Sequence, residues 1–192
     1  MKKIILSATL ALMGFGLFSS ALQAKECFHA KSIDVKWVSY KTMAKIGVGG
    51  NFSSSSFAQE TEDATSTAVM LQGATVKLSL ANLDAHNPTK NSNIAEYFVA
   101  NLSAKEINAK IVSADEKQLT VAITLNKRTQ NIPMSYTIKN SKIIANGVID
   151  ALDFDLVPAL RTLNKNVSGH KNKGWNDISI AFEMPFTTAT CK

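Results

Sequence analysis

The feature that most restricts the fold of this chain is a two-residue alternation of apolar and polar side chains along five segments. The apolar positions are Ile33, Val35 and Trp37; Val76, Leu78 and Leu80; Leu119, Val121, Ile123 and Leu125; Ile132, Met134, Tyr136 and Ile138; and Ile178, Ile180, Phe182, Met184 and Phe186. Successive side chains of a β-strand point to opposite faces of the sheet. Each segment is therefore predicted to be a strand with one dry face and one face in water.

Three weaker segments, residues 45–52, 107–113 and 143–150, raise the expected number of strands to eight. Turn-rich residues such as Asn126-Lys127-Arg128 and Asn140-Ser141 separate them. Eight one-sided strands can hide their apolar faces as two packed sheets or as a closed barrel. An eight-stranded barrel has an interior just wide enough for packed side chains or for one small ligand.

Two segments carry a helical pattern instead. Apolar residues recur at helical spacing over residues 156–167, and Asp155 is the expected N-cap. A shorter helix is expected over residues 94–100, because Asn93 and Glu96 resemble a capping box. Neither linker nor internal repeat separates these elements, so one domain is expected.

The first 24 residues are typical of a secretory signal peptide. A basic pair, Lys2 and Lys3, precedes an apolar run that is shorter than the roughly 20 residues needed to cross a bilayer. A retained anchor is the alternative. We expect cleavage near Ala24, a mature domain spanning residues 25–192, and a location in the periplasm.

The chain contains two cysteines, Cys27 and Cys191, near the two ends of the mature domain. Disulfides persist in oxidising compartments, so export favours a Cys27–Cys191 bridge. Such a bridge requires the first and last strands to be neighbours, because its Cα atoms must lie within about 7 Å. Two unpaired thiols are the alternative.

No known catalytic or nucleotide-binding motif occurs in the sequence. There is no G-x-S-x-G, C-x-x-C, H-E-x-x-H or glycine-rich phosphate loop, and His29, His86 and His170 lie far apart. The 19 basic and 15 acidic residues of positions 25–192 are scattered, unlike the basic patches of nucleic-acid-binding proteins. We therefore expect no catalytic residue, no metal, no cofactor and no nucleic-acid partner.

Four stretches carry a resemblance to a known family. They are residues 35–52, with Trp37 and Gly47-Val48-Gly49-Gly50; residues 76–98, which end in Tyr97-Phe98; residues 119–150; and residues 170–180. Together they resemble the YceI-like family, periplasmic lipocalin-like proteins associated with binding polyisoprenoid and related amphiphilic chains. Family members commonly carry an Arg-Asp pair where this chain has Lys90-Asn91.

The resemblance implies a mainly β fold: an eight-stranded antiparallel lipocalin-like barrel with an elongated apolar cavity and one or two short capping helices. It implies no established enzymatic reaction. We therefore expect a periplasmic carrier that holds an isoprenoid-like or fatty amphiphile. The expected wall residues are Val35, Trp37, Val48, Leu78, Phe98, Val121, Met134, Tyr136 and Phe182, and the expected head-group contacts are Lys90, Asn91 and Lys173.

Several alternatives remain open at the level of sequence. The inward faces of the strands are equally compatible with a solid core. The chain could be an integral outer-membrane barrel of eight strands, or an enzyme acting on a lipid or quinone-like substrate inside the barrel. The expected partner is a lipid-like small molecule, while transient membrane contact and a homodimer are left open.

Overall fold

The structure, a computed structural model, describes residues 25–191, so the predicted signal peptide lies outside the described residues. All eight segments predicted as strands form strands. They are β2 (Asp34–Lys41), β3 (Ile46–Phe52), β5 (Thr75–Ser79), β7 (Glu106–Ala114), β8 (Gln118–Leu125), β9 (Arg128–Lys139), β10 (Lys142–Asp150) and β11 (Asp177–Thr190).

The predicted strand count of eight is too low, because residues 25–191 contain eleven strands. The additional strands are β1 (Glu26–Ala30), β4 (Ser56–Ala58) and β6 (Leu83–Asp84). Strands of two to five residues show little alternation, so periodicity alone does not reveal them. Their place in the sheet is set by the neighbours with which they pair.

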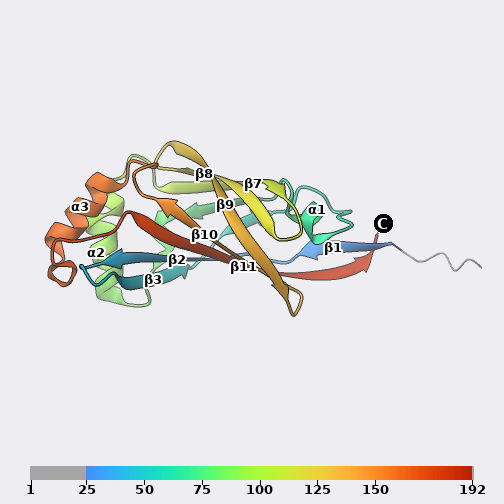
Figure 1. Cartoon of the computed structure of the whole chain (residues 1–192), viewed down its shortest axis with the longest axis horizontal. Helices are drawn as coiled ribbons and strands as arrows, with labels where there is room; N and C mark the ends of the chain where they lie inside the picture. Colours follow the sequence, from blue (N-terminus) through green and yellow to red (C-terminus); the bar gives the residue numbers. More distant parts are fainter. Residues whose placement is uncertain (1–24, 192) are drawn as a thin grey trace, which may run out of the picture.

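The strands form one antiparallel sheet that curls into a lipocalin-like barrel (Figure 1). Their order is β4-β5-β7-β8-β9-β10-β11-β2-β3-β6, and β1 pairs with the far half of β11. The first and last strands are therefore neighbours, as the cysteine argument requires. The sheet ends at β4 and β6, and the chain itself crosses between these edges, from β3 to β4 and again from β5 to β6.

Two hairpins close with the turn residues expected from the sequence. Asn126 and Lys127 have φ values of 49° and 66°, and Asn140 and Ser141 have φ values of 51° and 54°. Two consecutive left-handed residues are the signature of the type I′ turn, whose twist matches that of the flanking strands. The buried side chain of Asn126 also accepts a hydrogen bond from Ser103 N at 2.7 Å and donates one to Phe154 O at 3.1 Å.

The helix expected over residues 94–100 begins earlier, as α2 (Pro88–Tyr97). Asn87, rather than Asn93, is the N-cap: its side chain accepts a hydrogen bond from Lys90 N at 3.0 Å. Pro88 follows at the first helical position, where a missing N–H costs nothing. The Asn-Pro pair was therefore the stronger start signal.

The helix expected over residues 156–167 is present as α3 (Val157–Asn166), with Leu160 and Leu163 buried. Its predicted cap is wrong: Asp155 has a φ of 53°, and its carboxylate instead accepts a hydrogen bond from Arg128 Nε at 2.7 Å. The third helix, α1 (Thr67–Leu71), was not expected. Within residues 25–191, none of the helices is long and apolar enough to cross a membrane.

The predicted orientation of the strands is correct. Leu78 and Val121 are 7% and 6% exposed, whereas Lys77, one residue away, is exposed. Around α1 the interior is solid: Met70 and Leu71 of α1 are fully buried, in the same hydrophobic core as the fully buried pair Ile143 and Met184. The apolar faces of the curled sheet thus meet inside the barrel.

The outer face carries an ion-pair network across β2, β11 and β10. The Glu183 carboxylate accepts hydrogen bonds from Lys142 Nζ at 2.8 Å and from Lys36 Nζ at 2.5 Å. These two ammonium groups, Lys142 more than Lys36, lower the pKa of Glu183 from 4.5 to about 2. The network joins the early strand β2 to the last two strands, β10 and β11.

We expect this network to stabilise the protein only where Glu183 is ionised. A carboxylate whose pKa is lowered by folding contributes stability above its unfolded-state pKa, and the contribution is lost as the pH falls through the folded-state value. Glu183→Gln should lower the free energy of unfolding by about 1–2 kcal/mol at neutral pH, allowing for solvent screening. Urea unfolding from pH 7 to pH 2 should show this difference disappearing between pH 4.5 and pH 2. A difference that stays constant with pH would contradict this assignment.

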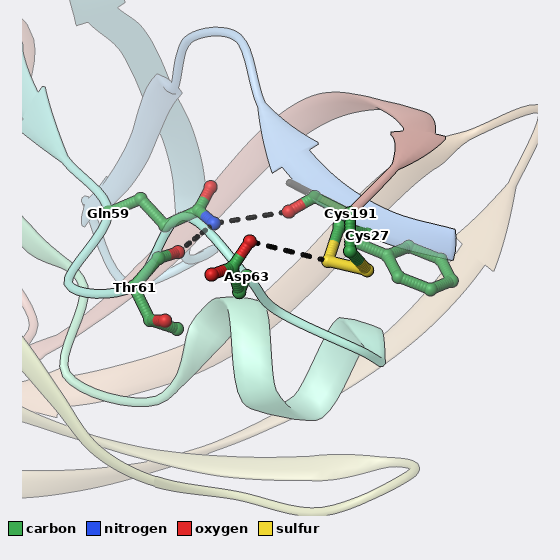
Figure 2. Close-up of a disulfide and its surroundings, with 6 residues drawn as sticks. Cys27, Gln59, Thr61, Asp63 and Cys191 are labelled. Carbon is green, nitrogen blue, oxygen red and sulfur yellow. Dashed lines mark hydrogen bonds between the residues drawn. A yellow bond between two sulfur atoms is a disulfide. The ribbon is translucent and has the colours of Figure 1, made fainter. Parts of the chain in front are cut away.

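The expected disulfide is present. Cys27 and Cys191 are bonded, with their Cα atoms 5.0 Å apart, and the bridge joins β1 to the end of the chain. Figure 2 shows the segment that covers it: Gln59 Nε2 donates to Phe28 O at 3.1 Å, and Asp63 Oδ1 lies 3.9 Å from Cys27 Sγ. Because of this cover, Cys27 is fully buried.

Candidate functional site

The barrel is hollow in the half that α2 and α3 cover, at the left of Figure 1. A cavity of about 240 Å³ lies there, slightly below the roughly 300–1,000 Å³ typical of small-molecule sites. It is lined from the strands by the dry faces that the alternation predicts. It does not extend among the residues that pack around α1, so the barrel is both hollow and solid, in different halves.

The walls of the cavity are almost entirely aliphatic and aromatic. The strands contribute Val35, Trp37, Val48, Phe52, Val76, Leu78, Leu83, Ile107, Ala109, Ile111, Val121, Ile123, Leu125, Met134, Ile149, Ile178, Ile180 and Phe182, and Ile33 lines it just before β2. Because nearly every strand supplies part of the wall, the cavity follows directly from the inward phase of the sheet.

The two capping helices complete the apolar lining. Ile94 and Phe98 reach the cavity from α2 and the residue after it, and Leu160 and Leu163 reach it from α3. The apolar stripe of α3 thus covers a cavity rather than a filled core. Pro88 and the Asn87 cap fix where α2 begins, and so fix which of its residues face inward.

Four polar side chains of the lining, Tyr40, Lys41, Asn164 and His170, gather around the turn between β2 and β3. Ser39 of β2 and Lys90 and Asn93 of α2 also border the cavity. Lys36 also borders it, but its ammonium group pairs with Glu183 on the outer face. No Asp or Glu borders the cavity within the described residues.

His170 is held in place at this polar end. Its Nδ1 lies 2.7 Å from Asn164 Oδ1, and the neighbouring Gly174 backbone leaves no room for a larger residue beside Asn164. Burial, and to a smaller extent the charge of Lys41, lower the pKa of His170 below its ordinary value of 6.5. The imidazole is therefore neutral near pH 7.

Nine of the twelve residues predicted to contact a ligand line this cavity. They are Val35, Trp37, Val48, Leu78, Lys90, Phe98, Val121, Met134 and Phe182. Trp37 also carries a buried indole N–H that has no hydrogen-bond partner among residues 25–191. Such a donor is costly unless a water or a bound molecule supplies the acceptor.

The other three predicted residues lie outside the cavity lining. Tyr136 belongs to the solid half, where its hydroxyl donates to Asp115 O. Asn91 supports the start of α2, since its side chain accepts from Ala85 N at 2.7 Å and donates to Asp84 Oδ1 at 2.8 Å. Lys173 Nζ lies 4.6 Å from the centroid of the Trp175 ring, on the surface.

Sequence reasoning missed the polar end of the cavity. Tyr40, Lys41, Asn164 and His170 come from two distant segments, and no motif links them. The contribution of α3 was visible as a helical stripe, but a stripe does not distinguish packing from cavity lining. Among residues 25–191, no group of three or more His, Cys, Asp or Glu side chains could hold a metal ion.

Solved structures share this architecture. A polyisoprenoid-binding domain from Saccharophagus degradans, implicated in plant cell wall breakdown, matches with a TM-score of 0.59 and 14% identity over 85% of this chain and 98% of its own. BcnA from Burkholderia cenocepacia matches with a TM-score of 0.54 and 16% identity over 82% and 96% of the two chains. The Campylobacter jejuni YceI protein matches with a TM-score of 0.52 and 17% identity over 79% and 90%. The chain has the YceI-like fold.

The YceI-like fold was the one expected from the four sequence stretches, and the structural matches confirm that resemblance. No family model and no curated protein sequence matches the chain. At identities of 14–17% the matched structures establish the arrangement of the backbone. Which ligand the cavity accepts depends on the side chains that line it in this protein.

Proposed function

We propose that this protein is an exported carrier that holds the apolar chain of one isoprenoid-like or fatty amphiphile in its barrel. The observation that supports this most directly is the division of the cavity lining. Its walls are apolar on nearly every strand, and four of its polar residues, Tyr40, Lys41, Asn164 and His170, gather at one end. An amphiphile has the same division.

The size of the cavity favours a slender occupant. A volume of about 240 Å³ suits a single hydrocarbon chain better than a fused ring system. Each methylene group removed from water contributes about 0.8 kcal/mol, which must exceed the cost of immobilising the ligand. A chain of about ten buried carbons would therefore bind with useful affinity.

The polar end favours a head group that is neutral or negatively charged. Lys41 at this end is a cation, as is Lys90, which borders the cavity from α2, and His170 is neutral near pH 7. A cationic head group would meet repulsion there. A carbonyl, hydroxyl or phosphate oxygen would find donors.

We infer binding rather than catalysis, and no cofactor. The polar residues at the cavity do not form a nucleophile–base pair: within residues 25–191 the imidazole of His170 makes a side-chain hydrogen bond only with Asn164, and no hydroxyl or thiol contacts it. The matched Saccharophagus domain is described as polyisoprenoid-binding, which supports the same role. If purified protein converted its bound molecule into a product, the enzyme alternative would replace this proposal.

A periplasmic location is part of the proposal. It is supported by the signal-like residues 1–24 and by the buried Cys27–Cys191 bridge, which an oxidising compartment maintains. Release of the protein from cells by osmotic shock should follow. Retention in the outer-membrane fraction would favour the integral barrel instead.

The decisive experiment is mass spectrometry of molecules that co-purify with the protein. We expect one class of amphiphile, at up to one molecule per protein, in native mass spectra and in organic extracts. The ligand should leave on denaturation. Protein that stays free of ligand after incubation with fatty acids and isoprenoid alcohols would contradict the proposal.

A further inference from the structure

Two basic segments meet at one end of this protein, where Asp150 and Asp177 flank the second of them. Residues 38–49 and 156–176 contain six basic residues and no Asp or Glu. The rest of positions 25–192 contains 13 basic and 15 acidic residues. These two segments therefore carry more than the entire net positive charge of the mature chain.

The two segments lie together at the end of the barrel where the cavity has its polar residues (Figure 1). The turn between β2 and β3 contacts the segment after α3 through hydrogen bonds of 3.0 Å from Thr42 N to Lys173 O and from Trp175 N to Tyr40 O. Trp175 Nε1 also donates to Thr42 O at 2.8 Å. The turn is thus a rigid part of this end.

Two lysine side chains lie over the ring of Trp175 on this surface. Lys173 Nζ lies 4.6 Å from the ring centroid, and Lys45 Nζ lies 5.0 Å from it. Lys45 Nζ also forms an ion pair with Asp177 at 2.7 Å. Lys165 and Lys171 are exposed and have no ion-pair partner among residues 25–191. These two lysines are free to bind external anions.

Two large apolar side chains project from the same turn. Met43 is 79% exposed, more than any other large apolar residue of the described chain, and Ile46 is 52% exposed. Apolar side chains held in water beside lysines are typical of surfaces that enter the interface of an anionic membrane. Two side chains are too few for a stable dimer, which buries about 800 Å² on each partner.

We propose that this end, formed by residues 41–46 and 165–175, docks on anionic lipid bilayers and places the polar end of the cavity against the membrane. Met43 and Ile46 enter the acyl region, and Lys165 and Lys171 bind head-group phosphates. A ligand chain then passes between bilayer and cavity without crossing water. The inference rests on the proposed carrier function for its purpose, but the docking can be measured independently of ligand.

The test is cosedimentation of the full mature protein with vesicles. Vesicles of equal parts phosphatidylcholine and phosphatidylglycerol should bind the protein, and binding should fall with added salt. Each lysine near an anionic surface contributes roughly fivefold to affinity, so Lys165→Gln/Lys171→Gln should weaken binding about 25-fold. Met43→Ser/Ile46→Ser should weaken vesicle binding at least tenfold. The fluorescence emission of Trp175 should shift when the wild type is mixed with anionic vesicles.

Matched controls lie away from this end. Lys117→Gln/Lys139→Gln removes two exposed lysines, and Ile138→Ser removes an apolar side chain that is 47% exposed at the β9–β10 hairpin. Both should bind vesicles like the wild type. Docking is overturned if the wild type does not bind anionic vesicles, if binding is equal on pure phosphatidylcholine, or if the controls lose as much as the test variants. It is also overturned if Met43→Ser/Ile46→Ser only converts a dimer into a monomer.

The same samples separate this inference from the carrier function. None of the four substituted test residues lines the cavity, so their variants should retain the co-purifying amphiphile at wild-type levels. Retained ligand with no vesicle binding by the wild type would overturn docking alone. Vesicle binding by a protein that never holds an amphiphile would overturn the carrier function and leave the docking surface established.

Discussion

Purified Leu78→Arg protein is expected to contain none of the amphiphile that co-purifies with the wild type. Leu78 lies in the cavity wall with 7% exposure, and an arginine there would place an unpaired charge in an apolar space. That costs several kcal/mol and removes apolar contact from the ligand. Val121→Asp, on the inward face of β8, should have the same effect. Organic extraction followed by mass spectrometry measures the loss.

The matched controls are the neighbours that point outward. Lys77→Glu and Thr120→Lys change charge one residue away on the same strands, and both should retain the ligand. Because a charged wall could unfold the barrel, Val121→Phe provides a second test that keeps the interior apolar but fills space. It should remain folded by circular dichroism and hold a shorter chain or less ligand. Loss of ligand in the outward variants, with retention in the inward ones, would contradict the wall assignment.

Removal of the disulfide is expected to cause the largest loss of stability. The Cys27–Cys191 bridge closes a loop with a sequence separation of 164 residues. In the chain-entropy model, a loop of this length contributes about 5 kcal/mol by restricting the unfolded chain. Cys27→Ala/Cys191→Ala should therefore unfold at a much lower urea concentration, and reduction of the wild type should reproduce the shift.

The structure also predicts which segments open most readily once the bridge is removed. The bridge holds β1 on β11 beneath the cover of residues 59–64 (Figure 2), at the opposite end of the molecule from α2 and α3 (Figure 1). Amide exchange should accelerate most in β1 and in the segment that covers it. Below its unfolding midpoint, the reduced protein should still retain ligand. A stability change below about 1 kcal/mol would show that residual structure in the unfolded chain already brings the ends together.

The sequence by itself determined the eight principal strands, their inward phase and the bridge between the chain ends. The strands and their phase rest on local signals, and the bridge was expected because the chain has two cysteines and an export signal. Alternation reports which face of a strand is dry whatever its partner, and Asn126-Lys127 and Asn140-Ser141 specify their turns through their own backbone preferences. Seven predicted wall residues on strands line the cavity for the same reason: every inward strand residue in the hollow half must face it.

Only the tertiary structure decided which half of the barrel is hollow. Met134 and Tyr136 lie two residues apart on the same inward face of β9, yet Met134 borders the cavity and Tyr136 is packed in the solid half. That difference arises because α1 fills one half with Met70 and Leu71, while α2 and α3 only cover the other. The polar end is likewise a product of folding, because Lys41 and His170 are 129 positions apart and meet only where β2 turns beside the end of α3. Volume and proximity depend on how distant elements pack, and no local pattern encodes them.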